Sequence, residues 1–250
     1  MTKLPKFSDA KVLVIGDVML DRFWHGAATR IGPEAPVPVV KVAGIDDRPG
    51  GAGNVAINLA ALGVETTLSG LVGDDEHAKQ LRSAVEAKGV RWSVMPCPAD
   101  TIVKLRVLSR NQQLIRMDFE APLDDYADES FLQYASNLIA EHDLVILSDY
   151  AKGTLTNIGA LISACRVLKT PVLVDPKGAD FSRYAGATLI TPNLSEFEAV
   201  VGACHQDEKL ISARARELCD QYGFEAVLVT RSERGMTLQS SEGEPLHLPA

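Results

Sequence analysis

Three features of this 250-residue sequence predict an α/β fold with a doubly wound, mainly parallel sheet, helices on both faces and a small β lid. Short β-branched runs alternate with longer amphipathic segments, which is typical of βαβ units. The runs are almost continuously apolar, as in strands covered on both faces. Two stretches break the alternation, at about residues 35–43 and 101–120, because strand patterns follow one another there without a helix. These stretches predict the lid.

The expected elements follow in order along the chain. The apolar runs predict strands at Lys11–Gly16, Thr67–Val72, Leu144–Leu147, Pro171–Val174, Thr188–Ile190 and Ala226–Thr230. The amphipathic segments predict helices at Gly53–Leu62, Asp75–Lys88, Asp128–His142, Thr156–Leu168, Leu194–Val201 and Glu208–Tyr222. Right-handed crossovers would join these strands into one sheet. The second lid stretch is expected to form a hairpin with its turn at Ser109–Gln112.

Composition excludes several classes of partner. The 33 acidic and 25 basic residues give a net charge of −8, which disfavours binding to nucleic acid. No apolar run is long enough to span a membrane, and no signal-peptide pattern is present, so we expect a cytoplasmic protein. The four cysteines show no metal-binding or disulfide spacing, and no serine- or metal-hydrolase motif occurs.

Polar residues after the first strand form one candidate binding site. Asp17 and Asp21 lie in the segment GDVMLD, at the strand end where α/β folds bind ligands, and two carboxylates there can accept hydrogen bonds from sugar hydroxyls. The alternative is a pair that caps the following turn. Gly50 and Gly51 precede a helix that carries Asn54 in its first turn. Glycines allow close backbone approach and a helix start offers free N–H groups, although the pattern by itself favours a plain turn.

Cations cluster on the predicted hairpin. Lys104 and Arg106 share one strand face, and Arg110 and Arg116 follow on the same hairpin. In a chain of negative net charge, such a group can hold a substrate phosphate. An ordinary solvated face is the alternative.

Three later segments, all at predicted strand ends, form a candidate nucleotide site. Their candidate residues are Lys177, Asn193, Leu194, Ser195, Glu196, Thr230 and Gly235. Glu196 with Asn193 can hold Mg²⁺ through water, which suits a cation that keeps its hydration shell. Asn193 is also a good cap for the helix that follows it.

Taken in order, the segments GDVMLD, GGAGN, SDYAKG, DPKG, TPNLSE and VTRSERG resemble the ribokinase-like (PfkB-type) carbohydrate kinase family over nearly the whole chain. The longer segments IGPEAPVPVVKV and LRVLSRNQQLIRMDFE are similar to its heptose 7-phosphate kinases. The resemblance implies transfer of the γ-phosphoryl group of ATP to O1 of D-glycero-β-D-manno-heptose 7-phosphate, in the synthesis of ADP-heptose for lipopolysaccharide core.

The resemblance also implies roles for single residues. Asp17, Asp21, Gly51 and Asn54 would bind the sugar. The segment 193–196 would match the family's NxxE element for Mg-ATP, Thr230 and Gly235 its nucleotide site, and Lys177 would lie near the transferred phosphoryl group. From charge, we infer that Lys104 and Arg106 reach the 7-phosphate.

One departure from the family pattern is important. The family's catalytic base is the Asp of a Gly-Ala-Gly-Asp motif, which is absent from these 250 residues and is expected beyond Ala250. Residues 1–250 are therefore interpreted as a C-terminally incomplete kinase domain that is inactive alone. Alternatives are another sugar or nucleoside kinase of the same fold, or a non-catalytic module for sugar-phosphate binding and dimerisation. Because alternate lid residues are apolar with nothing of the chain to cover them, a homodimer through the lid is expected.

Overall fold

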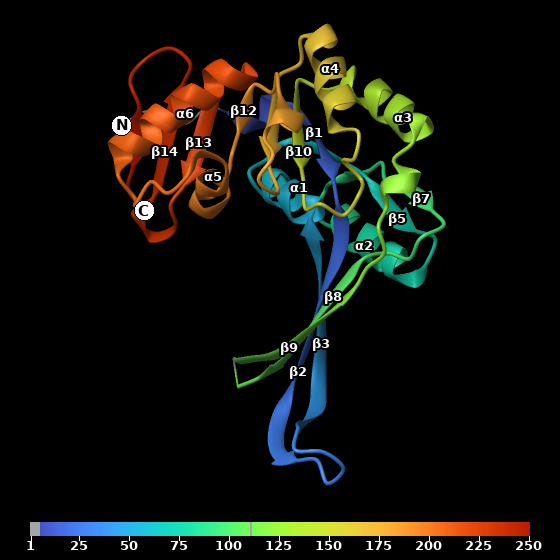
Figure 1. Ribbon diagram of the computed structural model, residues 1–250. Helices are drawn as coiled ribbons and strands as arrows, with labels where there is room; N and C mark the ends of the chain where they lie inside the picture. Colours follow the sequence, from blue (N-terminus) through green and yellow to red (C-terminus); the bar gives the residue numbers. More distant parts are fainter. Residues whose placement is uncertain (1–5, 111) are drawn as a thin grey trace.

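A nine-stranded sheet forms the body of the protein in the computed structural model, which describes residues 6–110 and 112–250 (Figure 1). The strand order is β15-β14-β13-β12-β11-β10-β1-β4-β6, parallel from β13 to β6 and antiparallel at β14 and β15. The strands are β1 (Lys11–Gly16), β4 (Glu65–Ser69), β6 (Arg91–Trp92), β10 (Leu144–Ser148), β11 (Val172–Asp175), β12 (Leu189–Ile190), β13 (Ala226–Thr230), β14 (Met236–Ser240) and β15 (Leu246–Leu248). The predicted fold class is confirmed.

Helices cover both faces of this sheet. They are α1 (Ala52–Ala61), α2 (Glu76–Glu86), α3 (Glu129–Ile139), α4 (Ile158–Leu168), α5 (Leu194–Val201) and α6 (Glu208–Tyr222), with short 3₁₀ turns at Phe7–Asp9, Asp124–Tyr126, Ser182–Tyr184 and Ser232–Arg234. Because side chains alternate along a strand, Leu13 and Ile15 of β1 join the core under α3, α4 and α6, whereas Val12 and Val14 join the core under α1 and α2. No helix in the described part of the chain is long and apolar enough to cross a membrane.

A four-stranded lid, ordered β3-β2-β8-β9, projects from the carboxyl edge of the sheet (Figure 1). Its strands are β2 (Val18–Ile31), β3 (Pro38–Gly51), β8 (Val103–Ser109) and β9 (Gln112–Phe119). The lid is larger than expected: the predicted segment 35–43 covers only part of β3, and β2 was not predicted. The expected turn at Ser109–Gln112 includes position 111, which lies outside the described residues.

One predicted strand is divided in two. The run Thr67–Val72 ends in the main sheet at Ser69, and the chain then enters a separate two-stranded sheet of β5 (Leu71–Gly73) and β7 (Met95–Cys97). Gly70 lies at the break, where a Cβ atom would come within 2.5 Å of the Gly16 carbonyl oxygen. The close approach of the two backbones therefore requires glycine at this position.

Candidate active site

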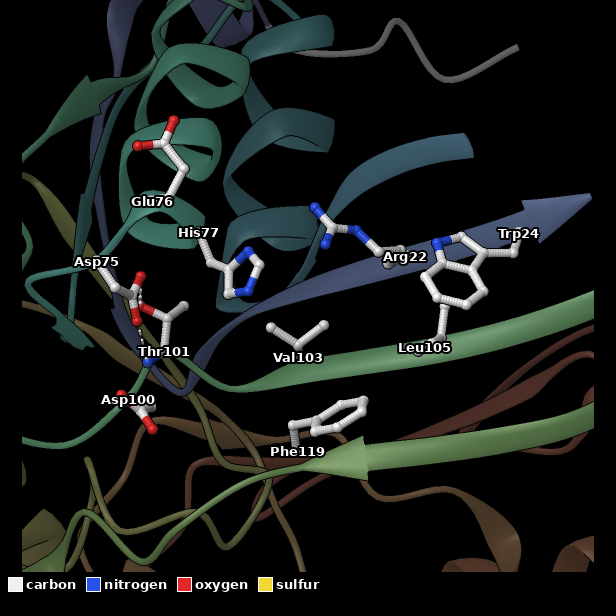
Figure 2. Close-up of a pocket in the computed structure, with 10 residues that line it drawn as sticks. All are labelled: Arg22, Trp24, Asp75, Glu76, His77, Asp100, Thr101, Val103, Leu105 and Phe119. Atoms are coloured by element: carbon white, nitrogen blue, oxygen red, sulfur yellow. Dashed lines mark hydrogen bonds between the residues drawn. The ribbon is translucent and has the colours of Figure 1, made fainter. Parts of the chain in front are cut away.

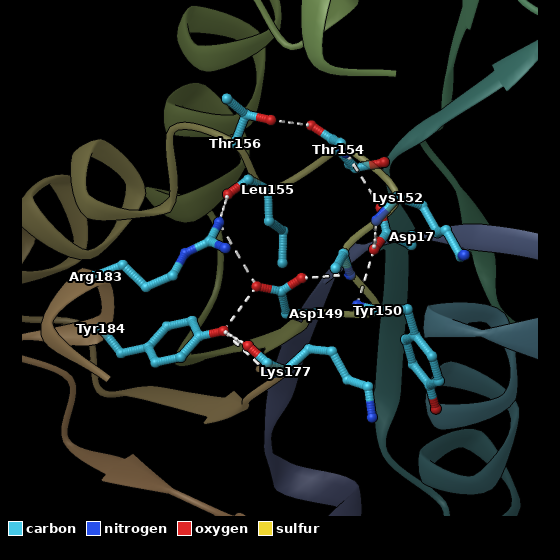
Figure 3. A network of polar contacts seen from close by, with 12 residues as sticks. Asp17, Asp149, Tyr150, Lys152, Thr154, Leu155, Thr156, Lys177, Arg183 and Tyr184 are labelled. Atoms are coloured by element: carbon cyan, nitrogen blue, oxygen red, sulfur yellow. Dashed lines mark hydrogen bonds and ion pairs between the residues drawn. The ribbon is translucent and has the colours of Figure 1, made fainter. Parts of the chain in front are cut away.

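Asp17 lies directly after β1 and is fully buried. Its carboxylate accepts three backbone hydrogen bonds from the loop between β10 and α4: from Tyr150 (2.8 Å), Lys152 (3.1 Å) and Thr154 (3.1 Å) (Figure 3). Burial raises the pKa of Asp17, while hydrogen bonds from these three residues oppose that shift. The side chain that we expected to meet a sugar therefore holds a loop in place.

The glycine turn before α1 is attached to the same residue. The Asp17 carbonyl accepts from the Ala52 N–H at 3.0 Å, where α1 begins. Gly51 has a φ of 55°, and a Cβ atom there would collide with that carbonyl. Asn54 is exposed in the first turn of α1. Asp17 thus fixes the start of the helix with its main chain and the β10–α4 loop with its side chain.

Asp21 lies at the base of the lid, facing the glycine turn. Its Oδ1 is 2.5 Å from a guanidinium nitrogen of Arg106, and a Cβ atom at Gly50 would lie 2.5 Å from its Oδ2. Both charged side chains are only about a fifth to a quarter exposed, at 24% for Asp21 and 21% for Arg106. The structure therefore joins one expected sugar ligand directly to one expected phosphate ligand.

The lid has two distinct faces. Along β8, residues 103, 105 and 107 are buried, whereas Lys104 and Arg106 are partly exposed on the other side, as the sequence predicted. Phe23, which the sequence analysis did not single out, lies on the same side between the guanidinium groups of Arg48 (5.1 Å) and Arg106 (5.2 Å). The positively charged side chains of this part of the lid are therefore on the same face as Asp21.

The later expected residues gather around a cavity of about 360 Å³ at the same edge of the sheet. It is lined by Asp149, Tyr150, Asp175, Pro176, Lys177, Thr191, Asn193, Glu196 and Thr230. Four of the candidate nucleotide residues therefore share one cavity. Leu194 and Ser195 are in the first turn of α5, and Gly235 is buried at the start of β14 beneath the carbonyl of Leu248.

Glu196 has two partners in this cavity. Its side chain accepts from the Asn193 N–H and the Asn193 side chain accepts from the Glu196 N–H, so the two residues form a capping box at the start of α5. The Glu196 carboxylate also pairs with the Lys177 ammonium at 2.8 Å. Asn193 is therefore the helix cap that the sequence allowed as an alternative. Glu196 contacts both the backbone of this cap and the ammonium group of Lys177.

Asp175, which ends β11, is the most perturbed carboxylate in the cavity. Burial, helped by the nearby Glu196 and Asp149 carboxylates and opposed by Lys177, raises its pKa to about 6. A carboxyl group with such a pKa is at the edge of ionisation near neutral pH. An approaching cation would complete its ionisation.

Asp149 and Tyr184 form a buried pair that the sequence analysis did not identify. The Tyr184 hydroxyl donates to Asp149 Oδ2 at 2.8 Å and accepts from the Lys177 N–H at 3.0 Å (Figure 3). Arg183 lies 3.7 Å from the same carboxylate. The pair connects the ends of β10 and β11 behind the cavity, and only the segment SDYAKG offered a signal for it.

A second cavity, of about 480 Å³, lies on the opposite face of the lid (Figure 2). Its floor is formed by Trp24, Val103, Leu105 and Phe119, and its rim carries Arg22 and His77. None of the expected site residues lines it. The candidate active site is therefore on the polar face, between the lid and the carboxyl edge of the sheet.

Comparison with known families identifies the family of this chain. The description of the pfkB family carbohydrate kinases matches residues 9–250. The chain belongs to this family. The resemblance inferred from the separate motifs is thereby confirmed.

Curated relatives include the bifunctional protein HldE of Shewanella piezotolerans, 53% identical over 248 residues, and HldE of Nitrosococcus oceani, 54% identical over 247 residues. Each alignment covers 98% of this chain and 52% of the relative. The chain spans about half the length of the curated relatives that it matches.

Solved structures share the fold at much lower identity. Arabidopsis thaliana ribokinase in complex with ribose and ATP has a TM-score of 0.71 at 18% identity, over 96% of this chain and 78% of that one. Escherichia coli phosphofructokinase-2 in complex with fructose-6-phosphate has a TM-score of 0.76 at 20% identity, over 96% and 80%. At these identities the comparison supports the fold.

Proposed function

We propose that this chain is the kinase part of an enzyme that transfers the γ-phosphoryl group of ATP to O1 of D-glycero-β-D-manno-heptose 7-phosphate. The observation that carries the proposal is the Asp21–Arg106 pair: the carboxylate that we propose for the sugar lies 2.5 Å from the guanidinium that we propose for the phosphate, at the same sheet edge as the cavity proposed for the nucleotide. Family membership and the relatives named HldE support a sugar kinase.

The polar lid face fits a sugar that already carries a phosphate. Asp21, Gly50 and the exposed Asn54 would contact the ring hydroxyls, and Lys104 and Arg106 would hold the 7-phosphate. Gly51 would contribute the close approach of its backbone. A guanidinium can bind phosphate through two parallel hydrogen bonds, so Arg106 would exchange Asp21 for the ligand without losing a charged partner.

The nucleotide cavity fits Mg-ATP. Among residues 6–110 and 112–250, no group of three His, Cys, Asp or Glu side chains could enclose a metal ion by itself. Mg²⁺ bound mainly by phosphates and water fits this site, with Glu196 and Asp175 as water-mediated partners. Lys177 and Thr230 would contact phosphates, and the metal would neutralise charge on them.

The Gly-Ala-Gly-Asp base of the family is not among these 250 residues, and we assign the general base to none of them. We also propose a homodimer through the apolar face of the lid, which is the face opposite Asp21 and Arg106 and includes Ile45 and Ile115. The four free, buried cysteines fit a reducing compartment, so we propose that the enzyme acts in the cytoplasm.

The test is an assay of ADP release by the full-length protein with Mg-ATP and one of three acceptors: heptose 7-phosphate, unphosphorylated heptose or adenosine. We expect turnover that depends on the 7-phosphate. Preference for adenosine or for unphosphorylated sugar would contradict the proposal, and binding of heptose 7-phosphate without any ADP release would favour a non-catalytic module.

A further inference from the structure

Tyr150 lies two residues beyond β10, at the carboxyl edge of the sheet. Its backbone N–H donates to Asp17 Oδ2 at 2.8 Å. The next residue, Ala151, has a φ of 55°, a left-handed conformation that non-glycine residues rarely adopt, and its N–H donates to Asp149 Oδ1 at 2.8 Å. These two contacts fix the direction in which the Tyr150 side chain leaves the loop.

The half-buried Tyr150 side chain lies in the nucleotide half of the candidate site and within electrostatic reach of the sugar half. It lines the nucleotide cavity together with Lys177 and Glu196. Burial raises the pKa of the phenol most, the carboxylates of Asp175, Asp21 and Glu196 raise it further, and Lys177 lowers it. Because Asp21 belongs to the sugar side and the other three belong to the nucleotide side, the phenol lies within electrostatic reach of both.

The two tyrosines of this site differ in what their hydroxyl groups contact. The Tyr184 hydroxyl is fully engaged behind the cavity, between Asp149 and the backbone of Lys177. The Tyr150 hydroxyl has no hydrogen-bond partner among the residues that the structure describes. In Figure 3 the Tyr150 and Lys177 side chains extend in the same direction, away from the Asp149–Tyr184 pair.

A phenol whose pKa is raised stays protonated at neutral pH, so Tyr150 can donate a hydrogen bond but cannot act as a general base. Carboxylates on both sides favour this neutral donor over a phenolate. An anionic group that enters between Asp21 and Lys177 would therefore meet an ammonium and a phenol hydroxyl, each with protons to donate.

We propose that the Tyr150 hydroxyl donates a hydrogen bond to the γ-phosphoryl group while it passes from ATP to the sugar. This role rests on the proposed kinase function. In that step the bond from the acceptor oxygen to phosphorus forms, the bond from phosphorus to the β,γ-bridging oxygen breaks, and ADP leaves. The proton of the acceptor hydroxyl passes to the general base and then to water, and Tyr150 keeps its own proton. A hydrogen-bond donor that contacts the phosphoryl group during transfer stabilises the transition state more than it stabilises either bound substrate.

The decisive variant is Tyr150→Phe in the full-length protein, because it removes only the hydroxyl. We expect kcat to fall by about 100-fold, the typical effect of losing one preorganised donor, while the KM values for sugar and ATP stay unchanged. The matched control is Tyr134→Phe, on a partly buried tyrosine of α3 that packs against the core. Calorimetric titration with ADP, with and without tetrafluoroaluminate as a mimic of the moving phosphoryl group, gives a second measure. The variant should bind ADP alone with the affinity of the wild type. It should not show the increase in ADP affinity that tetrafluoroaluminate causes in the wild type.

Wild-type kcat in Tyr150→Phe, or a raised sugar KM with unchanged kcat, would overturn the role of Tyr150 and leave the kinase proposal intact. A wild type that does not phosphorylate heptose 7-phosphate would overturn that substrate instead. The titration with ADP and tetrafluoroaluminate needs no sugar, so equal binding by the variant and the wild type would overturn the role of Tyr150 in that case as well.

Discussion

Arg106 of β8 and Asp21 of β2 form an ion pair with an N–O distance of 2.5 Å, although they are 85 residues apart in the sequence. Phe23 lies beside this pair with its ring 5.2 Å from the guanidinium carbon, so Arg106 is held on two sides. A cation held in this way is positioned before any ligand arrives. It would thus lose little conformational freedom when a phosphate replaces one of its partners.

Replacing the two lid cations should remove recognition of the distal phosphate. We expect Lys104→Gln/Arg106→Gln to weaken binding of heptose 7-phosphate by about 100-fold or more, because two charge-assisted hydrogen bonds at roughly 1.5–3 kcal/mol each are lost. Affinity for unphosphorylated heptose should change little. Calorimetric titration of the two sugars measures the difference. The control is Arg30→Gln, on an exposed arginine near the far end of β2. Equal losses for both sugars would mean that the cations do not contact the phosphate.

Substitutions of Asp17 and Asp21 should have different effects, the first mainly on the stability of the fold and the second mainly on sugar binding. Asp17→Ala leaves three buried or partly buried backbone N–H groups without an acceptor, so we expect the free energy of unfolding to fall by about 3 kcal/mol. Asp21→Ala should cost less stability but weaken sugar binding by about 10-fold, as loss of one charge-assisted hydrogen bond predicts. Urea unfolding and sugar titration of both variants give the comparison. A stable Asp17→Ala protein with lost sugar affinity would reverse the two roles.

Ionisation of Asp175 should make stability depend on pH. Its pKa rises from 3.8 to about 6 on folding, chiefly through burial, so between these values the folded state holds a proton that the unfolded state releases. Stability therefore falls as pH rises through this window, and at pH 8 the cost reaches at most about 3 kcal/mol. Asp175→Asn should be the more stable protein at pH 8, with the difference vanishing near pH 4.

Urea unfolding at several pH values between 4 and 8 tests this expectation. The control is Asp220→Asn, on an exposed carboxyl group of α6, which should keep the wild-type pH profile. If Asp175→Asn shows the same dependence of stability on pH as the wild type, another group titrates in this window.

The sequence predicted the buried body of the fold well. The bounds of β1, β13, α5 and α6 agree with the structure, because strands covered on both faces are apolar throughout and helices with one covered face are amphipathic. The long strand β2 was missed because the lid stands away from the body. Its residues, such as Arg22 and His25, are charged or polar on both faces and give no clear alternation.

The candidate site was predicted in its members but not in its contacts. Strand ends placed Asp17, Asp21 and the segment 193–196 at one edge of the sheet. The burial of Asp17 under the β10–α4 loop depends on contacts across 133 to 137 residues, which no local pattern reveals. Tyr150 was missed for the same reason, since only the tertiary fold brings its side chain into one cavity with Lys177 and within electrostatic reach of Asp21.

The apolar lid face should be covered by a second copy of the chain. Ile45, Trp24, Val107 and Ile115 occupy matching positions on β3, β2, β8 and β9, so they form one row across the face opposite Asp21 and Arg106. Ile45 is 62% exposed and Ile115 is 52% exposed, although both belong to regular strands. Apolar faces of this kind are usually covered by a partner, and a two-fold axis would let two identical rows cover each other.

We expect the wild type to be a dimer by light scattering and Ile45→Lys/Ile115→Lys to be a monomer with an unchanged far-ultraviolet circular dichroism spectrum. Both substituted side chains are mostly exposed in the single chain, so lysine can reach water there without disturbing the fold. Two rows that carry lysines would instead bury several charges against one another, which desolvation makes unfavourable. The control is Val167→Lys, at a valine of α4 that is 82% exposed and distant from the lid, and this variant should remain a dimer. A wild type that stays monomeric at high concentration would refute lid pairing, and a dimer that survives the double variant would place the interface on another surface.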